Sequence, residues 1–365
     1  MATHTSTLFA VGAVGLLLGL TLLVLAKRVV RGRAERRSRQ RRVAWVAALG
    51  TGAVTDMRLK QLRALGREAA RRAAAQEDLL ALLDSGRLPP HDDRRQPFQN
   101  ALRRSGLQRA LRSACTSRSA VARGRAALLW ARLGLGGAER MIAPLMADAD
   151  PDVRAAATQA LACCGSDEAA WALLHALRDG HVAPERVVER LTGAWAASPL
   201  LQALHEPGFL PVRAWLAEAL GLAGDARAEA SLVDMVVRGA VEERIRACRA
   251  LGRLSRPTSF ATLATALEDR SAAVRAQAAR ALADLGDPRS VKALAGLLDD
   301  DSWWVRARVA DALRAIGRKG LAALAQAADE HPDPFARERA IEALGLEPAG
   351  ALAALGARGA MATAA

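Results

Sequence analysis

Seven arginines recur at a nearly fixed spacing, and this spacing constrains the fold more than any other feature of the chain. Arg123 and Arg154 lie 31 residues apart, and five more arginines follow one another at intervals of 31 residues from Arg213 onward. A helical pattern with such a period is typical of stacked repeats, in which each unit buries its apolar face against its neighbours. The period therefore predicts an all-α solenoid. We call these residues the register arginines: Arg123, Arg154, Arg213, Arg244, Arg275, Arg306 and Arg337.

The sequence around each register arginine predicts a pair of helices. Most of these arginines follow, by four positions, a residue such as Ser271 or Asp333, whose side chain can cap a helix N-terminus. An apolar residue, usually leucine, stands seven positions after the arginine, and the helix so predicted is called helix B. Apolar i, i+4 pairs such as Leu263 with Leu267 precede the arginine and predict a partner, helix A.

The helix B pattern resembles a known repeat family. The clearest copies run from Val274 to Leu282 and from Val305 to Leu313, and both begin with Val-Arg and continue with small alanines. They resemble HEAT repeats, in particular the short bacterial type called phycobilisome-lyase-like. The resemblance covers roughly residues 107–345 and implies a solenoid of helix pairs. It blurs between residues 166 and 205, where three helix-breaking residues predict a distorted unit: Pro184, Gly193 and Pro199.

The beginning of the chain predicts a membrane anchor over residues 1–26. Leu8 to Ala26 is a run of nineteen residues without a charge, long enough as a helix to cross the hydrocarbon layer. A cleaved signal peptide would carry basic residues before this run, whereas here Lys27 and Arg28 follow it directly, so we expect an uncleaved span over about residues 8–26. Gly15 and Gly19 form a GxxxG pair that would allow a homodimer through this helix.

Basic residues collect just after the predicted span and predict its orientation. Positive charge favours the cytoplasmic side, so we expect the N-terminus outside and the rest of the chain in the cytoplasm, at the inner (plasma) membrane. The excess of arginine over lysine indicates GC-rich codons and a bacterial source. We expect the cluster to bind anionic lipid head groups. It comprises Lys27, Arg28, Arg31, Arg33, Arg36, Arg37, Arg39, Arg41 and Arg42.

The charge distribution argues against nucleic-acid binding. Residues 27–72 carry a net charge of +12, whereas residues 73–365 carry only +2. A solenoid that binds nucleic acid is expected to spread positive charge over the repeats themselves. We therefore divide the rest of the chain into a basic juxtamembrane helical segment (27–83), a linker or degenerate capping repeat (84–106), the HEAT-repeat solenoid (107–345) and a flexible tail (346–365).

No pattern in the sequence predicts a catalytic, cofactor-binding or metal site. The four cysteines are Cys115, Cys163, Cys164 and Cys248, and most of them fall on helix B positions, so we expect core thiols. Cys163 and Cys164 are adjacent and lack the two-residue gap that lets both sulfurs reach one zinc ion. We therefore predict a protein that is not an enzyme and that needs no cofactor.

Two HEAT-type enzyme families remain as alternatives. Deoxyhypusine hydroxylase resembles this chain in repeat type, but its two irons imply several His-Glu pairs. Here only His205-Glu206 has that order, and Glu330-His331 has it reversed. Phycobilin lyases are similar in helix B alone. A HEAT-type enzyme or enzyme subunit is therefore the alternative to a binding protein.

One polar face of helix B predicts where a partner binds. Positions two, five and nine after each register arginine share one face and escape the apolar pattern, so we expect them to line the concave surface; we call them the helix-B face. The competing interpretation is that these arginines only cover a solvent-exposed surface and bind no partner. The predicted partner-binding residues are Trp215, Arg246, Arg249, Arg253, Arg280 and Arg308, with Trp303 and Trp304 at the start of one helix B.

These observations together predict a membrane-anchored, non-catalytic scaffold or adaptor. Its HEAT repeats would dock a cytoplasmic or membrane protein, such as a membrane enzyme complex. The register arginines themselves are predicted to form a structural ladder with acids of the preceding inter-helix turn or of the next unit, such as Asp152, Asp269, Asp300 or Asp333.

Overall fold

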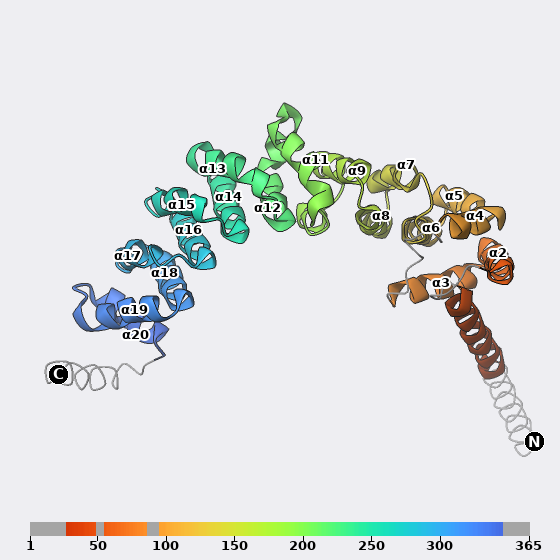
Figure 1. The fold of residues 1–365 in the computed structure, drawn as a ribbon, viewed down its shortest axis with the longest axis horizontal. Coiled ribbons are helices and arrows are strands. Elements are labelled where there is room, and N and C mark those ends of the chain that lie inside the picture. Colours follow the sequence, from red (N-terminus) through yellow and green to blue (C-terminus); the bar gives the residue numbers. More distant parts are fainter. Residues whose placement is uncertain (1–26, 49–54, 86–94, 346–365) are drawn as a thin grey trace, which may run out of the picture. The chain divides into compact units, whose positions relative to one another are not determined.

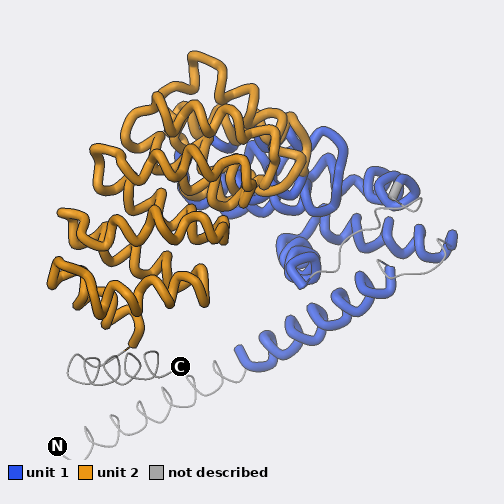
Figure 2. The backbone as a smooth tube through the Cα atoms, turned by 60° about the vertical axis from the view of Figure 1, so that its left-hand side comes forward, with its two compact units in different colours: residues 1–164 blue, residues 165–365 orange. Residues whose placement is uncertain are grey.

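The computed structural model describes residues 27–48, 55–85 and 95–345, and every regular element in these ranges is helical. The chain divides into two compact units, Met1–Cys164 and Gly165–Ala365 (Figure 2). We describe each unit by itself. Most of the helices are labelled in Figure 1.

Unit 1 begins with a helix over residues 27–48 and continues as a stack of shorter helices. Helices α2, α4 and α5 pack on one another, α3 packs on α6, and α6 packs on α8. The elements are α2 (Asp56–Arg71), α3 (Ala73–Asp84), α4 (Arg95–Arg104), α5 (Leu107–Cys115), α6 (Ala120–Arg132), α7 (Ala138–Ile142), the 3-10 helix η1 (Ala143–Ala147) and α8 (Pro151–Cys164). Helices α6 and α8 are the helices B that carry Arg123 and Arg154.

Unit 2 opens with a distorted region and continues as regular helix pairs. The distorted region holds α9 (Asp167–Arg178), α10 (Pro184–Val188), α11 (Ala194–His205) and η2 (Pro207–Val212). Helices B then pack each on the next (Figure 1); they are α12 (Arg213–Ala223), α14 (Val241–Leu254), α16 (Ala272–Leu285), α18 (Trp303–Ile316) and α20 (Pro334–Ala343). Between them come η3 (Ala226–Ala228), α13 (Glu229–Arg238), η4 (Pro257–Ser259), α15 (Phe260–Ala266), α17 (Ser290–Ala295) and α19 (Arg318–Glu330).

Part of the predicted domain organisation lies outside the described residues. This applies to the anchor over residues 1–26, with its span about 8–26 and the Gly15–Gly19 pair, and to the tail over residues 346–365. Within the described ranges, no helix is long and apolar enough to cross a membrane. Of the segment 84–106, for which a linker and a degenerate capping repeat were both predicted, residues 95–104 form α4, which packs on α2 and α5.

The helices B approach one another closely because small residues lie where they meet. Of the leucines seven positions after the register arginines, all but Leu344 are fully buried, for example Leu251 and Leu282, and each such burial stabilises the fold by about 1.5–3 kcal/mol. Beside them, a Cβ added at Gly221 would lie 2.7 Å from the Cα of Ala250. Substitution of this glycine would therefore push α12 and α14 apart.

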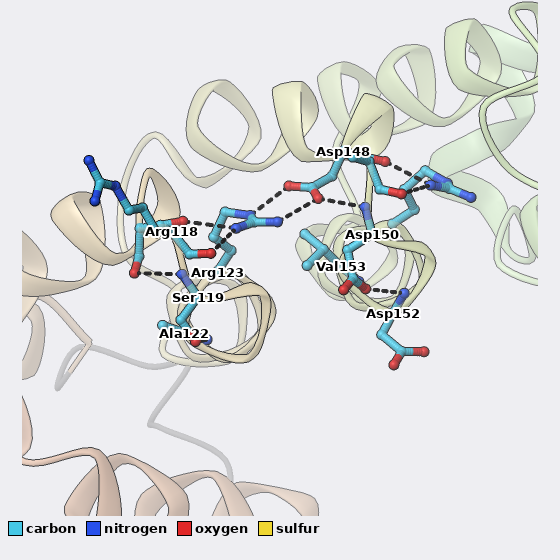
Figure 3. A network of polar contacts seen from close by, with 11 residues as sticks. Arg118, Ser119, Ala122, Arg123, Asp148, Asp150, Asp152 and Val153 are labelled. Carbon is cyan, nitrogen blue, oxygen red and sulfur yellow. Dashed lines mark hydrogen bonds and ion pairs between the residues drawn. The ribbon is translucent and has the colours of Figure 1, made fainter.

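A paired arginine and aspartate link successive repeat units. In Figure 3, the guanidinium of Arg123 on α6 donates two hydrogen bonds to the carboxylate of Asp148, from Nε and Nη2, both 2.7 Å long. Asp148 also accepts from the backbone N–H of Asp150 at 2.9 Å, so it orders the turn before α8. One carboxylate thus caps the turn of one unit and binds the arginine of the unit before it.

The same arrangement recurs twice in unit 2, each time with 25 residues between the partners. Arg244 binds Asp269 at 2.8 and 2.9 Å, and Arg275 binds Asp300 at 2.7 and 2.8 Å. Burial raises the pKa of Asp300, but hydrogen bonds from Arg275 and from the Ser302 amide outweigh it, and the pKa lies below its ordinary value. The pair therefore contributes fully above the ordinary pKa of aspartate, about 3.9, and its contribution is lost as the pH falls through the lower folded value.

The predicted partners of the register arginines were correct for Asp269 and Asp300 and wrong for Asp152 and Asp333. Six of the seven register arginines donate to carbonyl oxygens of the turn before their own helix B rather than to a carboxylate of that turn. Arg275 Nη1, for example, donates to the carbonyl of Asp269 at 2.9 Å. The carboxylate of Asp333 instead caps α20 by accepting from the amides of Phe335 and Ala336. The acid that binds an arginine comes from the unit that follows it.

We expect Arg275→Ala to lower the free energy of unfolding by about 2 kcal/mol, because it removes two charge-assisted hydrogen bonds and leaves Asp300 nearly buried without its partner. Thermal unfolding followed by circular dichroism measures this change. Arg227→Ala is the matched control, since Arg227 also binds an aspartate through two nitrogens but is largely exposed. Equal melting temperatures for Arg275→Ala and the control would contradict the structural role of the ladder.

Candidate functional site

A buried carboxylate surrounded by arginines lies where α12 meets α14. Glu218 stands on α12, five positions after Arg213, and is only 7% exposed. Three arginines of α14 converge on it: Arg253 at 2.5 Å, Arg249 at 3.2 Å and Arg246 at 3.6 Å. A charge this well covered is stable only when it is paired, and these arginines provide that pairing. These three arginines outnumber the acids that they bind, Glu218 and Glu242, so the cluster carries excess positive charge.

Trp215 completes the cluster one turn before Glu218. The guanidinium of Arg246 lies over its ring, 3.5 Å from the ring centre, which is a close cation–π contact. Arg246 also binds Glu242 on its own helix at 2.8 Å, and its side chain is only 14% exposed. Arg246 therefore holds the cluster together, while Arg249 and Arg253, 38% and 35% exposed, present their guanidinium groups to solvent.

The other residues predicted for the helix-B face extend from this cluster along unit 2. Arg280 on α16 is exposed and has no carboxylate at ion-pair distance among the described residues. On α18, Arg308 lies over the ring of Trp304 at 4.3 Å and binds Asp311 at 3.7 Å. Trp303 meets Trp304 edge to face, with ring centres 5.5 Å apart. The structure thus brings Trp215, Arg246, Arg249 and Arg253 together and places Trp303, Trp304 and Arg308 in a second group.

Two features of this face were not predicted. Glu218 was not recognised, although it stands at position five after its register arginine, where an acid among arginines could have indicated a buried pair. In unit 1, Arg125 and Arg132 occupy positions two and nine after Arg123 and bind Glu77 and Asp84 of α3. Both arginines stand at helix-B face positions of α6, but the sequence does not indicate which acids bind them.

Two arginines of the basic cluster after the predicted span bind an aspartate within unit 1. Arg41 binds Asp78 of α3 at 2.6 Å, Arg42 binds it at 3.3 Å, and Ser38 donates a hydrogen bond to it. Burial raises the pKa of Asp78, but these hydrogen bonds and the charge of Arg41 hold it below its usual value. The prediction that Arg41 faces lipid is wrong, since its side chain is 13% exposed. The rest of the cluster, Lys27, Arg28, Arg31, Arg33, Arg36, Arg37 and Arg39, is exposed.

The cysteines differ in their exposure. Cys115 and Cys248 are buried, and burial raises the pKa of the Cys248 thiol to about 12. Burial, with the charge of Glu139 and the neighbouring Cys163, also raises the pKa of Cys164 to about 12. Cys163 is exposed, so its prediction as a core thiol is wrong; it lies at position nine after Arg154, on the solvent side of α8.

The histidines of the enzyme alternative stand at helix ends. His205 is the last residue of α11 and lies 3.3 Å from the hydroxyl of Ser231. His331 follows α19, and its Nδ1 accepts from the amide of Asp333 at 3.2 Å. The described residues bring together no group of three or more histidine, cysteine or acidic side chains that could hold a metal ion.

The repeats match a known family model. A model of HEAT repeats matches residues 239–314 and 293–358, which include α14 to α20. Residues 239–358 therefore carry HEAT repeats. This agrees with the helix pairs of unit 2 and with the predicted resemblance. No curated protein matches the chain.

Several solved structures are similar to this HEAT-repeat chain at low identity. Human deoxyhypusine hydroxylase in complex with glycerol is 21% identical over 79% of this chain and 96% of that one, with a TM-score of 0.30. An engineered protein is 20% identical over 87% of this chain and 92% of its own, with a TM-score of 0.35. Kap95p, which binds RanGDP, is 14% identical, with a TM-score of 0.45, and the match covers 80% of this chain and half of Kap95p. These likenesses assign no function to the chain.

We expect a single cysteine to react rapidly with a maleimide in the folded protein. Cys163 is exposed, whereas the buried thiols have raised pKa values and form little of the reactive thiolate at neutral pH. Mass spectrometry after brief labelling at pH 7.5 counts and locates the modified residues. The Cys163→Ser variant serves as the control and should remain unlabelled. Rapid labelling of Cys248 would show that the core of α14 is open.

Proposed function

We propose that this protein is a membrane-anchored, non-catalytic HEAT-repeat scaffold, and that the helix-B face of unit 2 docks a protein partner. The observation that carries the proposal is the cluster of Trp215, Glu218 and three arginines on α12 and α14. Tryptophan and arginine are the residues that most often anchor protein interfaces, because they combine large contact areas with directed polar groups. Their positions here are fixed by packed helices rather than by loops.

The burial of Glu218 prepares this surface for a partner. Its contacts hold the three arginines of α14 in place before any partner arrives, so little side-chain entropy is lost on binding. Arg249 and Arg253 each keep about a third of their side-chain surface exposed. A partner can therefore bind their outer edges without first breaking their contacts with Glu218.

The membrane side of the proposal rests on the sequence. The uncharged run from Leu8 to Ala26 precedes the exposed basic residues of the helix over residues 27–48. Anionic lipid head groups attract such residues by about 1 kcal/mol each near the surface. This arrangement would place the HEAT repeats in the cytoplasm, next to the inner membrane and the proteins in it.

Site-specific photo-crosslinking in intact, alkali-washed membranes tests both parts of the proposal. A benzoylphenylalanine in place of the exposed Asp284, at position nine after Arg275 on α16, should crosslink one protein, and the same group in place of Arg238 on helix α13 should not. The crosslink should disappear when Trp215→Ala and Arg249→Gln are added. The chain should remain in the washed membranes and should leave them when residues 1–26 are deleted.

Two results would contradict the proposal. One is the same crosslinking pattern from positions 284 and 238, which would remove any role for the helix-B face; the other is a chain released by the alkaline wash. The enzyme alternative has its own readout, since iron or a covalently bound chromophore in the purified protein would favour it. Metal analysis and an absorption spectrum detect either group.

A further inference from the structure

Helix α3 already lies on the helix-B face of unit 1. It packs on α6, and Figure 1 shows it beside α6. Glu77 of α3 lies 2.5 Å from Arg125 of α6, and Asp84 forms an ion pair with Arg132. The two acids are seven residues apart on α3, as the two arginines are on α6. An acidic helix is thus held against a helix B by two carboxylate–guanidinium pairs.

Burial of side chains accompanies these pairs. Leu79 and Leu82 of α3 are buried, and the side chains of Arg125 and Arg132 are each reduced to 13% exposure. The acids themselves remain more than half exposed, at the edges of the contact. A buried apolar side and acids at its exposed edge make α3 an amphipathic helix, the kind that commonly binds grooves.

The same register positions recur in unit 2 without such a helix. Arg246 and Arg253 stand two and nine positions after Arg244, as Arg125 and Arg132 do after Arg123, and Arg249 lies between them. Among the described residues, Arg249 and Arg253 have one carboxylate partner, Glu218, which comes from the neighbouring helix B. Their exposure is more than twice that of the arginines beneath α3.

Charge and spacing indicate what fits this part of the face. Arg280 on α16 adds an exposed cation beside α14, and packed helices lie about 8–10 Å apart. A helix rises about 1.5 Å per residue, so acids about two turns apart reach arginines on both α14 and α16. Exposed acids also flank the arginines, namely Glu242, Asp284 and Asp311. They would repel the continuous charge of a nucleic acid or lipid surface but leave room for separate carboxylates.

We propose that the helix-B face over α12, α14 and α16 binds an amphipathic helix of a partner protein that carries two carboxylates about two turns apart, in the way that α3 binds α6. This inference rests on the proposed docking function and specifies the partner's chemistry. Arg249, Arg253 and Arg280 bind the carboxylates, and Trp215 contacts the apolar side of the helix.

A stapled, fluorescent peptide with the sequence of residues 73–84 is the probe, because an unconstrained helix of this length is marginal in water. Fluorescence anisotropy with the full-length protein in detergent measures its Kd. We expect Arg249→Gln with Arg253→Gln to raise the Kd at least about tenfold, and Arg280→Glu to do the same without affecting the contacts of Glu218. The peptide with Glu77→Gln and Asp84→Asn should bind at least about tenfold more weakly.

The control protein carries Arg238→Gln and Lys319→Gln, which remove the same charge from exposed sites outside the helix-B face and should leave the Kd unchanged. Circular dichroism confirms that each variant is folded. The inference is overturned if the Arg280→Glu variant binds normally, because the peptide then occupies another surface such as α6. It is also overturned if the neutral peptide binds equally well, or if single-stranded DNA or phosphatidylglycerol vesicles displace the peptide more effectively than unlabelled peptide.

This test is separate from that of the proposed function. A crosslink from position 284 to a membrane protein, with no binding of the acidic peptide, leaves the docking function standing and removes the acidic helix. Peptide binding without any crosslink in membranes supports the binding of an acidic helix to this surface. It contradicts the proposed docking of a partner in the cell.

Discussion

The rest of the structure depends on a carboxylate that acts in two units at once. Asp148, Asp269 and Asp300 each order the turn before one helix B and bind the register arginine of the previous helix B through two hydrogen bonds. A two-point contact fixes orientation as well as distance. These pairs join α6 to the turn before α8 in unit 1, and join α14, α16 and α18 in unit 2. Within each of these groups the helices B are held in register, so positions two, five and nine line up.

The ladder has a gap beside the candidate site. The position 25 residues after Arg213 is Arg238 rather than an aspartate. The nearest carboxylate to Arg213 is that of Glu243, at 4.0 Å, and Arg213 Nε is buried without a hydrogen-bond partner within the described residues. Glu218 links the same two helices from the other side, through the arginines of α14. The cluster proposed to dock a partner therefore also replaces a missing structural link.

The sequence predicted the fold well because the period and the apolar positions are local signals. Leu251 and Leu282 are buried as expected, and the interruption at Pro184 and Gly193 marks the distorted start of unit 2. The ion pairs of Asp148, of Glu218 and of the two α3 acids were not predicted, since they join side chains 25 or more residues apart. The anchor over residues 1–26 stays a prediction, as it lies outside the described ranges.

A double-mutant cycle on Arg244 and Asp269 tests the central claim most directly. The free energies of unfolding of the wild type, Arg244→Ala, Asp269→Ala and the double variant give the coupling between two side chains that belong to different repeat units. A ladder that sets the register predicts a coupling of about 1.5–3 kcal/mol. A coupling indistinguishable from zero would mean that apolar packing alone aligns the helices, and would contradict the account.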